Sequence, residues 1–449
     1  MQQRSPGKNF AAKLLLLFVV LVSATGAAPR IINLGSNADV NGIAVTADGT
    51  AVLVGDNATT GLAAMWSIST SSVVTPATLT GPAGTPRLGT ATGISADGNY
   101  IVGSLTKTGS AFQFDGAVWT RTQPTNPTIV PDLSDPYPST QLRDISNTGL
   151  AVGNSGQSAY RWTSSSGGIA LPASGTTSAW ASAISASGAT IVGSANSISL
   201  GHPVAVTWNS GAYSVLDSNF SAAYGVSPNG QIVVGASDAV NDTQLLLDLA
   251  YWNNGQRNIL LDSNGDPITG GQALWATDSG IIGGYFGPAG TDPVEAWIYI
   301  LGMRSPMAFD TWWKQITGTN FPIHVTSIPA AVEKNGELYL ALEGGAYFAQ
   351  LQWAAPGDGN RDRKVDGADY VLWADNFLKT TGVDFSTGDF NGDGKVDGAD
   401  YIIWADNFNP GASAAQSLAV VPEPSSALLA VVGGIFAWTA FRRRFARKA

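Results

Sequence analysis

Gly93-Ile94-Ser95-Ala96-Asp97-Gly98-Asn99-Tyr100-Ile101-Val102-Gly103 decides the fold, because variants of this stretch recur along the chain. Further copies begin at Gly42, Asp144, Ala183, Gly225 and, in weaker form, Ala276. The turn glycines of the six copies are Gly49, Gly98, Gly149, Gly188, Gly230 and Gly280. Their spacings of 39 to 51 residues, with a mean near 46, indicate one supersecondary unit repeated over residues 30–353.

Each unit has the pattern of a hairpin followed by a tryptophan strand. Asp97-Gly98 is a preferred hairpin turn, with positive φ expected at both central residues. The closing Gly103 permits a bulge or a close approach of two backbones. The later tryptophans are Trp66, Trp119, Trp162, Trp208, Trp252 and Trp297, and we expect them to fill the space between units. A degenerate seventh unit contains Asn335-Gly336 and Trp353.

This repeat predicts a mainly β domain over residues 29–355. A sheet of about four strands cannot bury both faces alone, so the units must stack, and a period of 40–50 residues is typical of propeller blades. We therefore expect a six- or seven-bladed β-propeller, with a β-solenoid as the alternative. The segment 305–319 is expected to form a short amphipathic helix between the sixth and seventh units.

The repeat resembles the HAF-type extracellular repeat family, whose unit pairs a Gly-Ile-Ser/Asn…Val-Val-Gly stretch with a small-aromatic-x-Trp stretch. Residues 158–162 are the copy most similar to the second part. The histidine of that family is absent here, since Leu62, Asp115, Ser158 and Val204 occupy the matching positions. The resemblance implies the repeat architecture and an exported setting, and no particular activity.

Composition limits the functional classes. The chain of 449 residues has no Cys, so disulfides and Cys-based zinc sites are excluded. Its formal net charge of −10 argues against a nucleic-acid partner, because phosphate binding needs a basic face. The acidity is concentrated in residues 358–408, which hold 11 Asp, no Glu and 5 Lys plus Arg.

No catalytic residue is predicted. The two histidines, His202 and His324, are too few for a His-based triad or a multi-His metal site. Asp48 and Asp97 occupy hairpin turns, where Asp is explained by turn chemistry, and Asp144 opens a repeat. We expect the repeated tryptophans to form the blade core rather than sugar-stacking platforms.

Two copies of an acidic motif lie 31 residues apart, and the second has the pattern of a twelve-position calcium loop. Asp389, Asn391 and Asp393 occupy positions 1, 3 and 5, followed by Gly394 at position 6. The carbonyl of Lys395 and the carboxylates of Asp397 and Asp400 complete the oxygen set at positions 7, 9 and 12. Val396 at position 8 is expected to point into a core between the loops.

The first copy supplies the same set, with Arg363 in place of the position-6 glycine. Positive φ at a non-Gly residue costs about 1 kcal/mol, so we expect this loop to bind more weakly. The predicted ligands of two Ca²⁺ ions are Asp358, Asn360, Asp362, Lys364, Asp366 and Asp369 in the first loop, and Asp389, Asn391, Asp393, Lys395, Asp397 and Asp400 in the second.

The paired loops, each closed by Asp and followed but not preceded by a helix, resemble the type I dockerin over residues 357–408; a paired EF-hand is the alternative. The resemblance implies a small α-helical calcium module over residues 356–409, with a cohesin-like protein as a partner. Positions 10 and 11 are Gly-Ala in both loops, whereas cellulosomal dockerins commonly have hydroxyl residues there.

The chain ends carry export and sorting patterns. Residues 1–28 combine a basic start, an apolar run and small residues, as in a secretory signal peptide, with an uncleaved anchor as the alternative. After a linker over 410–420, residues 421–449 join Pro422-Glu423-Pro424 to an apolar helix and a basic cluster. This tail resembles the PEP-CTERM sorting signal, which implies exosortase-type machinery and a membrane attachment before processing; an ordinary tail anchor is the alternative.

Together these patterns predict an exported protein of the cell envelope or extracellular matrix. We expect a binding or scaffolding propeller, with a surface glycan or a cohesin-like protein as partner, and a calcium-dependent interaction module. The alternative is a glycan-active hydrolase or lyase of polysaccharide catabolism carried on the propeller. A pair of inward-facing carboxylates near the propeller axis would favour that alternative.

Overall fold

The computed structural model describes residues 28–110, 112–133, 138–238, 247–287 and 294–408. The predicted signal peptide, apart from residue 28, lies outside the described residues, as do the linker and the sorting tail. Among the described helices, none has the length and apolar character needed to cross a bilayer.

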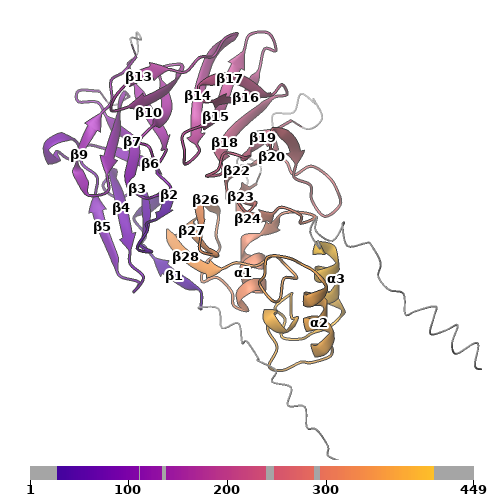
Figure 1. Cartoon of the computed structure of the whole chain (residues 1–449). Coiled ribbons are helices and arrows are strands. Elements are labelled where there is room, and N and C mark those ends of the chain that lie inside the picture. Colours follow the sequence, from indigo (N-terminus) through magenta and orange to yellow (C-terminus); the bar gives the residue numbers. More distant parts are fainter. Residues whose placement is uncertain (1–27, 111, 134–137, 239–246, 288–293, 409–449) are drawn as a thin grey trace, which may run out of the picture.

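Seven antiparallel sheets of four strands each form a ring, which is a seven-bladed β-propeller (Figure 1). Of the two predicted blade counts, seven is correct. Blade 1 comprises β2 (Ala38–Val45), β3 (Ala51–Asn57), β4 (Leu62–Ile68) and β5 (Val74–Thr78). Blade 2 comprises β6 (Gly89–Ile94), β7 (Tyr100–Thr106), β8 (Phe114–Thr120) and β9 (Gln123–Ile129). Blade 3 comprises β10 (Thr140–Ile145), β11 (Ala151–Ser155), β12 (Ser158–Thr163) and β13 (Gly167–Ala170).

The remaining blades continue the ring in chain order. Blade 4 comprises β14 (Thr176–Ile184), β15 (Thr190–Ser197), β16 (Pro203–Asn209) and β17 (Ala212–Asp217). Blade 5 comprises β18 (Ser221–Val226), β19 (Ile232–Ser237), β20 (Asp248–Asn253) and β21 (Gln256–Ile259). Blade 6 comprises β22 (Gly271–Ala276), β23 (Ile281–Phe286), β24 (Glu295–Ile300) and β25 (Met307–Ala308). Blade 7 comprises β26 (Ser327–Lys334), β27 (Glu337–Glu343), β28 (Tyr347–Gln352) and the N-terminal β1 (Arg30–Asn33).

Strand β1 closes the ring. It pairs antiparallel with β28, so the fourth strand of blade 7 comes from the start of the domain. The Arg30 guanidinium binds the Ser69 carbonyl at 2.8 Å, and Lys334 Nζ binds the Val45 carbonyl at 2.7 Å, so both side chains join blade 7 to blade 1. This closure rules out the solenoid alternative, and it explains why the seventh sequence unit is incomplete.

A β-bulge recurs in the inner strand of every blade. In β14 the register shifts between Ala181 and Ala183, opposite the closing glycine Gly193 of β15. A Cβ on Gly193 would lie 1.9 Å from the Trp180 carbonyl oxygen. Five other blades have the same contact, at Gly55, Gly103, Gly153, Gly235 and Gly284. The closing glycine is therefore needed because the backbone of the inner strand lies too close for a side chain, as its position in the repeat predicts.

The hairpin turns differ from the prediction in six blades. In blade 2 the Gly98 N–H donates to the Ser95 carbonyl at 2.7 Å, and only Gly98 has positive φ, at 75°. This is a type I turn followed by one left-handed glycine, a form that leaves Asp97 in an ordinary conformation. Among the seven turns that join the first and second strands of the blades, only that of blade 7 has positive φ at both residues, with 54° at Asn335 and 83° at Gly336.

The six predicted tryptophans are buried, and they pack between neighbouring blades as expected. Trp119 of blade 2 packs with Val52 and Val54 of blade 1, and its Nε1 donates to the Thr80 carbonyl at 2.8 Å. Trp208 of blade 4 packs with Val152 of blade 3. The tryptophans therefore belong to the core, and they are not exposed platforms for a ligand.

Three helices complete the described structure. Helix α1 (Phe309–Thr317) lies between blades 6 and 7, inside the segment predicted for it, and buries Trp312 and Trp313. Helices α2 (Gly367–Asn376) and α3 (Gly398–Asn407) follow the two acidic loops. Short 3-10 turns occur at Pro82–Gly84 and Phe385–Thr387. The C-terminal loops pack against α1, with Phe385 and Phe390 in the same core cluster as Trp312 (Figure 1).

Candidate functional site

The second acidic loop encloses two buried carboxylates, Asp389 and Asp400, which are 3% and 0% exposed. The Oδ1 atom of Asp389 accepts from the Asp393 N–H at 3.1 Å, and its Oδ2 accepts from the Gly394 N–H at 2.9 Å. The carboxylate of Asp400 accepts from the Asn391 and Asp397 N–H groups at 3.0 and 2.8 Å. The backbone is therefore wrapped around positions 1 and 12 of the predicted loop.

The first acidic loop reproduces this geometry with Asp358 and Asp369, both 0% exposed. Asp358 accepts from the N–H groups of Asp362 and Arg363 at 3.1 and 3.0 Å. Asp369 accepts from the Asn360 and Asp366 N–H groups at 3.1 and 2.9 Å. Burial, together with the nearby Asp369 carboxylate, raises the pKa of Asp358 to about 7.

Positions 5 and 9 also take part in local hydrogen bonds. Asp366 and Asp397 are the N-caps of α2 and α3, where one carboxylate oxygen accepts from the N–H two residues on, at 2.8 Å in both loops. Asp362 and Asp393 accept in the same way from the Lys364 and Lys395 N–H groups, at 3.0 and 2.9 Å. Position 9 therefore initiates each helix, a role that the predicted ligand pattern did not include.

Two reciprocal tryptophan hydrogen bonds join the loops, and they were not predicted from the sequence. Trp373 Nε1 of α2 donates to the Asp397 carbonyl of the second loop at 2.8 Å. Trp404 Nε1 of α3 donates to the Asp366 carbonyl of the first loop, also at 2.8 Å. The buried Val365 and Val396 lie at the predicted core position of each loop. The signal was present in the sequence, because both tryptophans lie at the same position of the 31-residue repeat.

The two loops differ where arginine replaces glycine. Arg363 has φ 72°, and Arg361, whose counterpart is Gly392, has φ 57°. Arg363 pairs with Glu333 of blade 7 at 3.4 Å and lies 5.5 Å from the Trp353 ring. Arg361 donates to the carbonyl of Ile316, at the end of α1, at 3.1 Å. The strained positions of the first loop thus hold it against the propeller.

The loops suit a hard cation by their chemistry. All the side-chain atoms that could coordinate a metal ion in these loops are oxygens. Each buried carboxylate oxygen that accepts one N–H keeps a further lone pair for the ion. In the part of the chain that the structure describes, no three His, Asp or Glu side chains are gathered as a metal-binding group. The buried carboxylates form a pair in each loop, so the other oxygens would come from the aspartates at positions 5 and 9, the asparagine side chain and the lysine carbonyl.

A second candidate site lies on the propeller axis. A cavity of about 720 Å³ is lined by residues of all seven blades, including the bulged residue of each inner strand. The bulged residues are Asn41, Thr92, Arg143, Ser182, Tyr224, Leu274 and Pro329. The next residue in each strand also lines the cavity, and it is glycine in blades 1, 2 and 5 but Asp144 in blade 3.

Asp144 bridges two blades within this cavity. Its Oδ1 accepts from the Ile145 N–H at 2.8 Å, and its Oδ2 accepts from the Ile184 N–H of blade 4 at 2.9 Å. Burial raises the pKa of Asp144 to about 7, and these two hydrogen bonds oppose the rise only in part. Asp144 therefore binds a proton more readily in the folded chain than in the unfolded chain.

We expect Asp144→Asn to flatten the dependence of propeller stability on pH between about 4 and 7. Because the folded pKa is raised, the stability contributed by Asp144 is complete below its ordinary pKa and is lost as pH rises through about 7. The variant should lack this loss, which is on the order of 4 kcal/mol. Denaturant unfolding at a series of pH values measures it, and equal slopes for both proteins would contradict the assignment.

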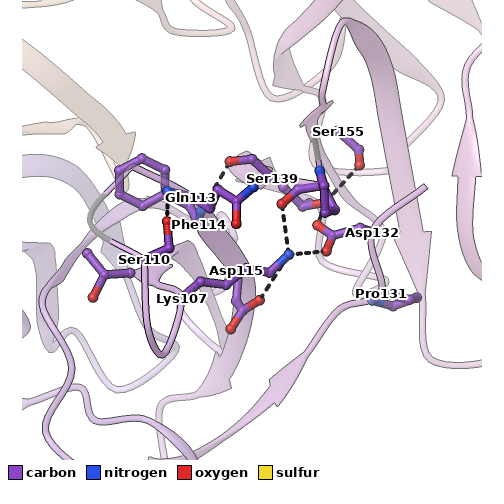
Figure 2. A network of polar contacts seen from close by, with 12 residues as sticks. Lys107, Ser110, Gln113, Phe114, Asp115, Pro131, Asp132, Ser139 and Ser155 are labelled. Carbon is purple, nitrogen blue, oxygen red and sulfur yellow. Dashed lines mark hydrogen bonds and ion pairs between the residues drawn. The ribbon is translucent and has the colours of Figure 1, made fainter. Parts of the chain in front are cut away.

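A charged network between blades 2 and 3 is structural. Figure 2 shows Lys107, after β7, pointing toward Asp132, with Asp115 of β8 on the other side at 3.9 Å. Asp115 also pairs with Arg87 at 2.6 Å, and Thr140 donates to Asp132 at 2.8 Å. Each carboxylate of this network is paired with a cation, so the network stabilises the blade junction.

Comparisons with known proteins assign the chain to no family. No protein-family model matches the chain, and no curated protein matches it. TolB from Acinetobacter baumannii is 16% identical with a TM-score of 0.33, over 49% of this chain and 53% of its own, so about half of TolB is spanned. YCF48 bound to D1 peptide is 16% identical with a TM-score of 0.43, over 72% and 97%. The WD40 propeller domain of Doa1 is 13% identical with a TM-score of 0.36, over 73% and 97%.

Proposed function

We propose that this protein is an exported binding protein of the cell envelope or extracellular matrix. Its propeller binds or scaffolds, and residues 356–409 act as a calcium-dependent, dockerin-like interaction module. The observation that carries the proposal is the pair of fully buried carboxylates in the first loop, repeated with almost the same hydrogen bonds in the second.

Calcium provides the charge that these loops lack. The four buried carboxylates receive hydrogen bonds from neutral N–H groups, whereas an isolated buried carboxylate is costly unless a cation balances it. The proposed ligands are those predicted for the two loops, with the second loop binding more tightly because Gly394 adopts its φ of 85° without strain. When bound, Ca²⁺ would order both loops and the starts of α2 and α3.

The module also presents an apolar surface that is suited to a partner. Tyr370 and Val371 of α2 are 40% and 51% exposed, and the equivalent Tyr401 and Ile402 of α3 are 41% and 59% exposed. Exposed apolar residues gathered on one small unit are typical of interaction sites. We propose a cohesin-like protein as the partner of this surface. The sorting tail would be recognised by exosortase-type machinery, and it would hold the chain at the membrane until it is processed.

The alternative function, a glycan-active hydrolase or lyase, has one observation in its favour. Asp144 lines the axial cavity with a pKa of about 7, as a general acid requires. Both of its oxygens accept backbone hydrogen bonds, and the other carboxylate lining the cavity, Glu343, belongs to blade 7 rather than to a neighbouring blade. Asp144→Asn would abolish hydrolysis of a polysaccharide substrate if this alternative were right.

A glycan array probed with the purified chain, in calcium and in chelator, tests the binding role. We expect glycan binding by the propeller to survive chelation, while calorimetry detects two Ca²⁺ ions per chain and no comparable uptake of Mg²⁺. Cell fractionation of the producing bacterium should place the protein in the envelope or matrix. A cytoplasmic protein that takes up no calcium would overturn the proposal.

A further inference from the structure

We propose that the axial cavity binds a small carboxylate that is rich in hydroxyl groups, such as a uronic acid residue, with Arg143 as the anion anchor. This inference rests on the proposed binding role of the propeller and specifies its ligand class. The cavity volume of about 720 Å³ is within the range of small-molecule pockets, about 300–1,000 Å³.

Arg143 is placed in the cavity by the bulge of β10, which makes it the extra residue between Leu142 and Asp144. Its guanidinium donates to Gln141 Oε1 at 3.2 Å, and none of the described ion pairs includes it. Desolvation lowers its pKa, but the residue is exposed to solvent, so its guanidinium is open to a ligand in the cavity. A planar guanidinium with free N–H groups is suited to bind a carboxylate through two parallel hydrogen bonds.

Further donors lie on the blades that follow Arg143 around the ring. Ser182 of blade 4 and Tyr224 of blade 5 occupy the same bulged position, and no hydrogen bond of the described structure uses their hydroxyls. Burial raises the pKa of the Tyr224 phenol, so it stays protonated and can donate to an anion. Blades 3, 4 and 5 therefore present, in sequence, a guanidinium with further N–H groups to donate and two unused hydroxyls.

The bulged residues of blades 1 and 2 are used differently. Thr92 donates to the Leu142 carbonyl of blade 3 at 2.7 Å, and Asn41 donates to the Ala91 carbonyl of blade 2 at 3.2 Å. These two side chains join neighbouring blades and are not available to a ligand. Bulged side chains in blades 1 and 2 thus bond to a neighbouring blade, whereas those of blades 3, 4 and 5 do not. A ligand would therefore bind on the side of the cavity formed by blades 3, 4 and 5.

The cavity also favours a ligand with hydroxyl groups. Trp180 of blade 4 and Gln272 of blade 6 line it, and they offer a ring for C–H groups and an amide that both donates and accepts. Glu343 of blade 7 also lines the cavity, away from blades 3, 4 and 5, and its carboxylate would accept a hydrogen bond from a ligand hydroxyl. Asp144 competes weakly with the ligand for Arg143, because both of its oxygens already accept N–H groups.

The test is calorimetric titration of the full chain with D-galacturonate and D-glucuronate, against D-galactose, D-glucose and acetate. We expect the uronates to bind at least about tenfold more tightly than the neutral sugars or acetate, a difference of about 1.4 kcal/mol. Arg143→Gln should remove that preference, whereas Arg161→Gln, in the same blade outside the cavity, should change the affinity less than twofold. Equal unfolding temperatures of the two variants would show that Arg143→Gln leaves the fold intact.

Three outcomes would overturn the inference: no preference for uronates, a preference that survives in Arg143→Gln, or uronate binding that disappears in chelator. The last outcome would place the site in the calcium loops. None of them bears on calcium uptake or on export, so the proposed function can fail or stand independently.

Discussion

Gly193→Ala is expected to destabilise the propeller by about 3 kcal/mol, among the larger effects of a single added methyl group. The new Cβ would lie 1.9 Å from the Trp180 carbonyl oxygen and 3.0 Å from the Ala181 Cα, which are both backbone atoms. A flexible side chain could move aside, but here the inner strand of blade 4 would have to shift, together with its bulge. Thermal and denaturant unfolding of the purified variant measure the loss.

Gly398→Ala is the matched control, because it adds the same methyl group where no atom lies within 4 Å of the new Cβ. Gly398 begins α3, so alanine should leave stability unchanged or raise it by up to about 1 kcal/mol. If Gly193→Ala unfolded at the same denaturant concentration as Gly398→Ala, the close backbone approach in the blades would not be the reason for their glycine.

Asp400→Ala is expected to abolish calcium uptake by the second loop while the first loop retains its site. Asp400 is fully buried, caps the loop through the Asn391 and Asp397 N–H groups, and lies in the first turn of α3. Loss of a carboxylate ligand should weaken the second site by at least about 100-fold, or about 3 kcal/mol. Calorimetric titration should then fall from two ions per chain to one.

Asp406→Ala is the control for this experiment, since Asp406 is exposed on α3 outside the loop. It should leave both sites intact. Chelation of the unaltered protein should also reduce helical circular dichroism, while the β signal of the propeller remains. Uptake of two ions by Asp400→Ala, or of none by the unaltered protein, would contradict the assignment of the loops.

The repeat itself could be predicted from the chain. The turn glycine at positions such as Gly98, the closing glycine at positions such as Gly103 and the strand tryptophans recur with a period near 46 residues. Local physics accounts for this success, since a left-handed turn, a close backbone approach and a buried aromatic each admit few residue types. The two acidic loops were equally visible, because the same pattern of oxygen-bearing residues recurs 31 positions apart in one segment.

Turn type was beyond the sequence pattern. Asp97-Gly98 suits a two-residue turn with positive φ at both residues as well as a type I turn with one left-handed glycine. The structure adopts the second form, in which the buried Ser95 hydroxyl donates to Asp97 at 2.6 Å and accepts from the Tyr100 N–H at 3.0 Å. A buried hydroxyl at this position depends on the packing around the turn, which the dipeptide alone does not describe.

The sequence by itself determined the repeating unit and the positions of the acidic oxygens, because both depend on residues that are near one another in the chain. Only the tertiary structure decided the blade count and the neighbours of Arg143, Asp144 and Arg363. Strand β1 completes blade 7 from the far end of the domain, and each inner-strand bulge directs one side chain to a common axis. These are contacts between distant segments, and closure of the ring is the physical event that creates them.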